Sequence, residues 1–264
     1  TALGAISFLA CEAIGGSLTL AYGFNNTVAA ILAVGTLIFL TGLPIGYYAS
    51  KYGVDVDLLT RGAGFGYIGS TITSLIYASF TFLFFAIEAA IMSLALELCF
   101  GVPLFIGYVL SSLVVIPLVT HGITFISRFQ AWTQPFWLTL HLIPFVFIAV
   151  ADPGSFAAWT QFPGNTGVDG HGFNILLFGT ASTVVFSLIA QIGEQVDFLR
   201  FLPPQQRHNR WSWWLAHLSA GPGWILPGAL KMLAGSFLAF LAIEHLVPAD
   251  KAARVSRYQQ HMEK

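Results

Sequence analysis

Four ionisable side chains lie inside long apolar stretches of the sequence: Glu12, Glu88, Glu194 and Lys231. A charged side chain at the centre of a membrane helix costs at least about 2.5–3.5 kcal/mol on insertion scales, so such a residue indicates a functional site by default. Buried acids hold protons or cations, which is the chemistry of ion-coupled transport. The alternative for each residue is a snorkelling group near an interface, or a buried ion pair that locks helices together.

These alternatives separate the acids from the lysine. Short acidic side chains snorkel poorly, which favours a functional role for Glu12, Glu88 and Glu194. The long stem of Lys231 can reach a headgroup, so we expect that residue to snorkel. His141 lies in another apolar stretch, and we expect a hydrogen-bonded core histidine rather than a ligand.

The composition indicates a membrane protein. The 264 residues are 56% hydrophobic and 9% charged, whereas an ordinary soluble domain is about 25% charged. This excludes a soluble globular enzyme, a disordered tail and a disulfide-stapled secreted domain. The net charge of −1 gives no reason to expect nucleic acid binding. Cys11 and Cys99 both fall in apolar runs and suggest neither a disulfide framework nor a metal cluster.

Seven apolar stretches are long enough to cross a bilayer, whose core of about 30 Å needs roughly 20 helical residues. The runs are continuous rather than alternating, which argues against barrel strands, and helices satisfy their own backbone groups in lipid. We therefore predict an all-α transmembrane helical bundle. The expected spans are 2–24, 27–49, 65–96, 101–120, 129–151, 173–196 and 220–247.

The basic residues predict the orientation of these spans, because cytoplasmic loops carry an excess of Lys and Arg. The loops after the first, third and fifth spans carry none, so the loop 152–172 is expected outside a cell membrane, with the bacterial inner membrane as the expected compartment. We expect 1–248 to form one transmembrane domain, incomplete at both ends, and 249–264 to form a polar tail whose basic residues break the pattern. The loops after the second, fourth and sixth spans carry Lys51, Arg61, Arg128, Arg200, Arg207 and Arg210.

Glycines adjoin two of the acids. Gly15 and Gly16 follow Glu12, and Gly193 precedes Glu194. Glycine inside a helix costs about 1 kcal/mol relative to alanine, and such points can interrupt a transporter helix so that freed carbonyls bind ions and substrate. The alternative is close helix packing. Their occurrence in the first and sixth spans favours interruption, because folds of two inverted five-helix repeats break those helices.

The stretch 61–70, RGAGFGYIGS, resembles the Arg-x-Ser-Phe-Gly-x-x-Gly pattern of the nucleobase:cation symporter-1 family, the purine–cytosine permeases. Here Phe-Gly lies one residue further from the Arg, and Gly64 replaces the Ser. The stretches 42–46 and 197–201 also resemble the family. The resemblance implies an inverted-repeat (5+5) transporter with about seven helices present, and uptake of a nucleobase-like molecule coupled to H⁺ or Na⁺. It places a sodium site between the first and eighth helices, so we do not expect these seven to transport alone.

The resemblance also implies a substrate site between the third and sixth helices. Phe84 and Glu88 fall where the family has a Trp and a polar residue, and their spacing of four puts them on one helix face. Leu188 and Glu194 fall where the family has a Trp and an Asn, so the second aromatic wall is missing. The expected substrate-binding residues are Phe84, Glu88, Gln191, Glu194 and Glu12, and the expected ion-coupling residues are Glu12, Gly15 and Glu194.

The acids change the expected ligand. An ionised carboxylate only accepts hydrogen bonds, and Glu12, Glu88 and Glu194 in one pocket would repel unless protons or a cation compensate. We therefore expect a proton-linked site or a cationic, donor-rich ligand rather than a neutral pyrimidine.

A second function remains open. Bundles similar to this one also occur as the ligand-sensing membrane input of sensor histidine kinases, which implies a fused or partner kinase domain. The altered positions Leu188, Glu88 and Glu194 favour that interpretation, whereas the absence of a kinase segment favours the transporter. An enzyme is not expected, because the sequence has no His-Glu-x-x-His helix, no Gly-x-Ser-x-Gly elbow and no phosphate-binding loop.

Overall fold

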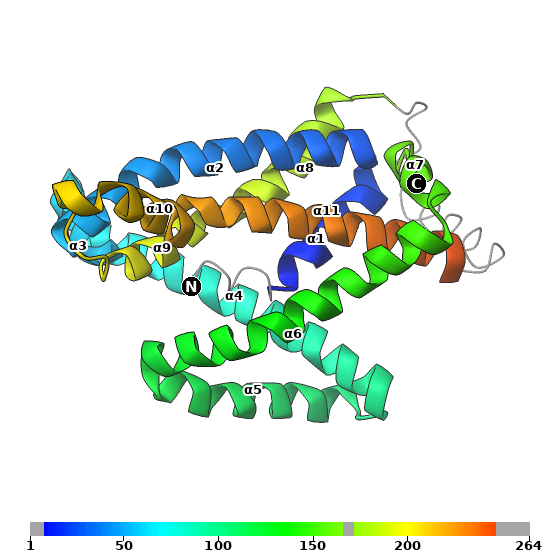
Figure 1. Cartoon of the computed structure of the whole chain (residues 1–264), viewed down its shortest axis with the longest axis horizontal. Coiled ribbons are helices and arrows are strands. Elements are labelled where there is room, and N and C mark those ends of the chain that lie inside the picture. Colours follow the sequence, from blue (N-terminus) through cyan, green and yellow to red (C-terminus); the bar gives the residue numbers. More distant parts are fainter. Residues whose placement is uncertain (1–7, 166–171, 247–264) are drawn as a thin grey trace. The chain divides into compact units, whose positions relative to one another are not determined.

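The computed structural model describes residues 8–165 and 172–246, and the regular elements within these ranges are all helical (Figure 1). The predicted polar tail 249–264 lies outside the described residues. In chain order the α-helices are α1 (Ala10–Tyr22), α2 (Phe24–Tyr52), α3 (Val56–Thr60), α4 (Gly66–Phe100), α5 (Leu104–Thr120), α6 (Gly122–Ala151), α7 (Gly154–Thr160), α8 (Ile175–Phe186), α9 (Ile192–Leu199), α10 (Arg210–Ala220) and α11 (Ile225–Leu241).

The long helices are those of a multi-pass membrane protein. Five helical stretches are long and apolar enough to cross a bilayer, whereas α5 is apolar but has 17 residues and the described part of the first expected span, α1, has 13. The five stretches are Phe24–Tyr52, Val56–Phe100, Thr124–Ala151, Ile175–Leu199 and Pro222–His245.

Several expected loops contain helix, and α3 lies in the one after the second expected span. His121 alone separates α5 from α6, and Gly122 makes this possible with a φ of 78° that other residues rarely adopt. Arg128, expected in a loop, is therefore inside α6. The expected external loop 152–172 contains α7, and the loop after the sixth span contains α10. The prediction from apolar length did not include these short helices, which are flanked by Gly and Pro, residues that usually end helices.

The chain divides into two compact units, which we describe separately. The described residues of the first unit are 8–10, 36–139 and 187–227. Those of the second unit are 11–35, 140–165, 172–186 and 228–246.

In the second unit, α1 and α11 touch backbone to backbone. A Cβ on Gly15 would lie 1.8 Å from the Met232 carbonyl oxygen, and one on Gly235 would lie 2.0 Å from that of Glu12. Small residues permit this approach between membrane helices. The interruption expected at Gly15 and Gly16 is wrong, because α1 runs unbroken from Ala10 to Tyr22 and its glycines serve close packing instead.

Aromatic side chains fill the rest of that unit around α11. Phe237 is 1% exposed and its ring stacks on Phe156 at a centroid distance of 4.4 Å and on Phe145 at 6.0 Å. The Trp159 indole N–H donates to Ser236 Oγ over 2.9 Å, and this oxygen lies 2.6 Å from Thr19 Oγ1. The hydroxyls of the packed helices are thereby hydrogen-bonded inside an apolar core.

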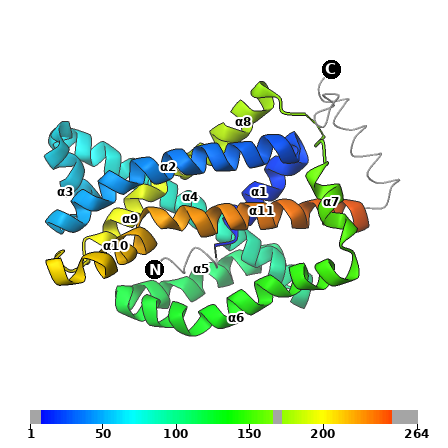
Figure 2. The same ribbon diagram turned by 45° about the horizontal axis from the view of Figure 1, so that its top comes forward.

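The sixth expected span is interrupted as predicted, at the point in the chain where the second unit ends and the first resumes. A 3₁₀ turn, Ser187–Gln191, separates α8 from α9. Gly193, just after this turn, lies against Tyr77 of α4, where a Cβ would come within 2.7 Å of the ring. Helices α3, α9 and α10 gather at one end of the first unit in both views (Figures 1 and 2).

The stretch 61–70 forms the connection between α3 and α4. A π-helical turn, Arg61–Phe65, ends at Gly66, and Gly64 and Gly66 have φ values of 102° and 65°. Glycine adopts these conformations without a steric penalty, whereas other residues do not. The glycines of this motif therefore have a backbone role.

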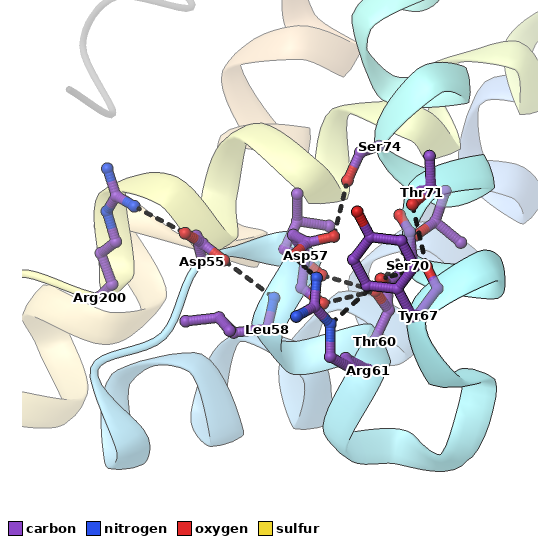
Figure 3. Close-up of polar contacts among 12 residues, drawn as sticks. Asp55, Asp57, Leu58, Thr60, Arg61, Tyr67, Ser70, Thr71, Ser74 and Arg200 are labelled. Atoms are coloured by element: carbon purple, nitrogen blue, oxygen red, sulfur yellow. Dashed lines mark hydrogen bonds and ion pairs between the residues drawn. The ribbon is translucent and has the colours of Figure 1, made fainter.

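Ion pairs hold this end of the first unit together (Figure 3). Arg61 Nη2 lies 2.6 Å from Asp57 Oδ2, and Arg200 Nη1 of the α9 end lies 3.4 Å from Asp55 Oδ2. Ser74 Oγ of α4 donates to Asp57 over 3.5 Å. The two aspartates thus connect α3 to both α4 and α9.

A buried histidine joins α2 to α10. His217 is 0% exposed, stacks on Trp213 at 5.1 Å and lies 3.4 Å from Ser50 Oγ through Nδ1. Trp213 is also buried and donates to the Pro203 carbonyl over 2.9 Å. The tryptophan therefore belongs to the core of this unit, whereas Trp211 is 84% exposed, as expected of an interfacial residue.

Replacing Gly235 by alanine is expected to destabilise the protein by about 1–3 kcal/mol, the usual range for overpacking. The new methyl group would meet the Glu12 backbone, which cannot move aside as a side chain would. The matched control is Gly179→Ala in α8, where nothing lies within 4 Å of the new atom. Thermal unfolding in detergent measures both variants, and an equal effect at the two positions would contradict the packing interpretation.

The stability of the protein is expected to fall as the pH decreases below the ordinary histidine pKa of 6.5. Burial lowers the pKa of His217, while the Leu43 backbone carbonyl opposes this shift. The unfolded chain then binds a proton that the folded chain does not, and stability is lost from pH 6.5 downward.

Unfolding midpoints of wild type and His217→Gln between pH 7.5 and 5 test this expectation. The variant should show a smaller decrease, whereas the exposed control His208→Gln should follow wild type. A His217→Gln decrease as large as that of wild type would be evidence against it.

Candidate functional site

The second unit brings together three ionisable side chains from three helices. Glu12 comes from the first turn of α1, His141 from α6 and Lys231 from α11. Lys231 Nζ lies 3.2 Å from Glu12 Oε1, and His141 Nε2 contacts the same carboxylate oxygen. We call these residues the Glu12 cluster.

The cluster is withdrawn from solvent. The side chain of Lys231 is 4% exposed, that of Glu12 15% and that of His141 19%. The prediction that Lys231 snorkels is therefore wrong, because its ammonium group turns to a carboxylate inside the unit. An ammonium group that is paired inside the protein does not need to reach water. Ionisable residues in membrane helices are usually paired in this way.

Helix packing explains why the lysine reaches the acid. Lys231 and Gly235 are four residues apart and share a face of α11, and Gly235 is where that face meets the Glu12 backbone. The glycine brings the two helix axes close enough for a direct ion pair. Gly235 and Lys231 thus act together: the glycine permits the close approach and the lysine makes the ion pair.

The electrostatics of the cluster centre on one carboxylate. Glu12 faces two basic side chains, Lys231 and His141, in a poorly hydrated site. Attraction between unlike charges is stronger in such a site than in water. A cation that reached Glu12 would therefore compete with Lys231 for the same carboxylate oxygen.

The structure places Phe84 and Glu88 in the first unit, on α4. Phe84 is 9% exposed, its ring stacks on Phe8 at a centroid distance of 5.5 Å, and it lies tilted against Phe80 at 4.4 Å. Glu88 Oε1 accepts a hydrogen bond from the backbone N–H of Ala10 over 2.6 Å. A carboxylate is well suited to the first N–H of a helix, which carries partial positive charge.

Gln191 and Glu194 also lie in the first unit, at the interruption between α8 and α9. Gln191 Nε2 donates to Glu194 Oε2 over 3.4 Å, and Glu194 lies close enough to Tyr77 of α4 to interact electrostatically with it. Leu188, at the position of the missing aromatic wall, is 0% exposed.

The expected site is therefore distributed over both units. Glu12 and Gly15 belong to the second unit, whereas Phe84, Glu88 and Glu194 belong to the first. Convergence of the three acids on one ligand stays a prediction. Gly15 has a packing contact with Met232 on the face that also carries Glu12.

Sequence reasoning did not assign His141 and Lys231 to a site. The available signal was their charge: both are basic side chains in apolar stretches, and Glu12 needs a partner of opposite sign. Within residues 8–165 and 172–246, no group of three or more His, Cys, Asp or Glu residues is arranged to hold a metal ion.

No family model, curated protein or solved structure matches this chain. The resemblance to purine–cytosine permeases, the inverted-repeat arrangement and the likeness to kinase input domains therefore stay predictions.

Replacing Lys231 by methionine is expected to destabilise the protein by about 3–5 kcal/mol, because it leaves a buried carboxylate without its lysine. The double variant Glu12→Gln with Lys231→Met should recover much of this loss, since both charges are then absent. The exposed Lys51→Met provides the control for loss of a lysine. Unfolding free energies in detergent complete the cycle, and additive effects of the two substitutions would show that the pair does not interact.

Proposed function

We propose that this membrane protein belongs to a secondary transporter in which the Glu12 cluster couples ion movement to the uptake of a small molecule. The observation that carries the proposal is the burial of Glu12, His141 and Lys231 together among membrane helices. Ionisable residues in this setting commonly belong to proton relays and ion pathways.

The coupling follows from competition for one carboxylate. When no transported ion is present, Lys231 neutralises Glu12 at 3.2 Å. A proton on Glu12 removes this attraction and frees the lysine, whereas a cation at Glu12 repels it. Either event changes the force between α1 and α11, whose backbones touch next to the pair. Ion occupancy thereby acts on the packing of two helices.

The substrate residues of the proposal lie around the interrupted α8–α9 segment and on α4. An interruption exposes carbonyls that the regular helix would use, and such breaks form binding sites in transporters. Phe84 offers a ring, while Glu88, Gln191 and Glu194 offer acceptors, which suits a nucleobase-like or cationic molecule rich in hydrogen-bond donors.

The second candidate is the ligand-sensing input domain of a histidine kinase. The observation that favours it is Leu188, which is buried and supplies no ring at the position where the resemblance places a Trp. A site without this wall binds planar molecules less tightly, and sensing does not need a transport cycle. Binding without uptake is its expected behaviour.

Vesicles reconstituted with the whole transporter of the proposal test it, because the spans of this chain are not expected to transport alone. A panel of radiolabelled cytosine, adenine and guanidinium is offered with and without an imposed pH or sodium gradient. We expect gradient-driven accumulation of one compound, and Glu12→Gln should abolish the gradient-dependent part because a neutral amide cannot exchange the proton or hold the cation. Glu97→Gln, an exposed acid of α4, is the matched control and should retain accumulation.

Three outcomes would contradict the proposal. Uptake that is unaffected by Glu12→Gln removes the cluster from coupling. Ligand binding without any gradient-driven uptake favours the sensor. Tight binding of neutral nucleobases that Glu88→Gln leaves unchanged removes the acids from ligand recognition.

A further inference from the structure

The first unit contains a second feature, remote in sequence from the Glu12 cluster: an open cavity of about 700 Å³ between α2 and the segment that leads into α10. Tyr47 and Tyr48 line it from α2, and Trp214 lines it from α10. Arg207 and Arg210 provide its positive charge, and no acidic side chain lines it. The proposed function uses none of these residues.

The two arginines have no anionic partner in the described part of the chain. Both are exposed, and the ion pairs of this end belong to other residues: Asp55 pairs with Arg200, and Asp57 pairs with Arg61 (Figure 3). Asp55 and Asp57 are thus already paired with other arginines. The cavity keeps a positive potential that an external anion can satisfy.

Helix α10 adds to this potential. The 3₁₀ turn Arg207–Asn209 leads directly into it, so the positive end of this helical run lies at the cavity. Gln206 and Asn209 form a capping box at the start of this turn. Arginine side chains beside a helix N-terminus are a combination that suits a phosphate group.

The walls of the cavity are apolar. The Tyr47 and Trp214 rings stack with centroids 6.0 Å apart and planes 12° apart. Next to the cavity, α10 exposes Trp211 and Leu215, which are 84% and 65% exposed and lie one helical turn apart. Tryptophan beside arginine is typical of the bilayer interface. A ligand with a charged head and an apolar stem matches this arrangement.

We propose that this cavity binds the phosphate headgroup of an anionic phospholipid, with Arg207 and Arg210 holding the phosphate. Basic pockets beside membrane helices on the cytoplasmic face bind such headgroups, and the basic residues predict that face for this segment. The lipid's glycerol region lies over the Tyr47 and Trp214 rings. A soluble phosphate compound would make the same contacts with the two arginines but no contacts with the apolar walls.

Lipid titrations of the whole purified chain in neutral detergent test the proposal by native mass spectrometry. Phosphatidylglycerol should bind more tightly than phosphatidylcholine. Arg207→Gln and Arg210→Gln should each weaken phosphatidylglycerol binding about fivefold, the usual contribution of one basic residue at an anionic membrane surface. Arg128→Gln, which removes an exposed arginine of α6 outside the cavity, should leave binding unchanged.

Competition distinguishes the two sources of phosphate. Inorganic phosphate and glycerol 3-phosphate at millimolar concentration should not displace phosphatidylglycerol. Displacement by either, with the same dependence on Arg207 and Arg210, would replace the lipid by a soluble phosphate ligand. Equal binding of the two lipids, or equal losses in all three arginine variants, would overturn the anion site. Unchanged thermal unfolding of the variants confirms that they are folded, and none of these results depends on transport.

Discussion

The backbone contact between α1 and α11 is the constraint on which the second unit depends. Gly15 and Gly235 leave no room for a side chain, so the two helices approach more closely than larger residues would allow. This approach places Lys231 beside Glu12 and brings both next to His141 of α6. Without it, a carboxylate in an apolar environment would lack its compensating charge, at a cost that membrane insertion rarely tolerates.

Charges in the first unit are compensated in a different way. There the acids Asp55 and Asp57 pair with arginines at one end of the helices, where water is available and each pair contributes little by itself. Because these aspartates are occupied by other arginines, Arg207 and Arg210 remain as unpaired positive charge within the described residues. Charge is therefore compensated internally in the Glu12 cluster and left for an outside partner at the cavity.

Some of the fold and of the site follows from local sequence. The apolar stretches predicted the long helices, and Gly193 beside polar residues predicted the interruption before α9. The same signal failed at Gly15, because a glycine weakens a helix and also lets another helix approach, and only the partner decides which effect counts. Short helices α7 and α10 were missed, since Gly and Pro flank them and α10 depends on Trp213 packing against His217 rather than on hydropathy.

The sequence by itself determined that this is an all-helical membrane protein and that Glu12 is costly where it lies. Both conclusions depend on the solubility of about 20 neighbouring residues in lipid, which is a local property. Only the tertiary structure decided that Lys231 is the partner of Glu12 rather than a snorkelling residue. Whether Lys231 pairs or snorkels depends on whether its Nζ, more than 200 positions along the chain, can come within 3.2 Å of Glu12 Oε1. The contact of Gly235 with the Glu12 backbone provides that approach.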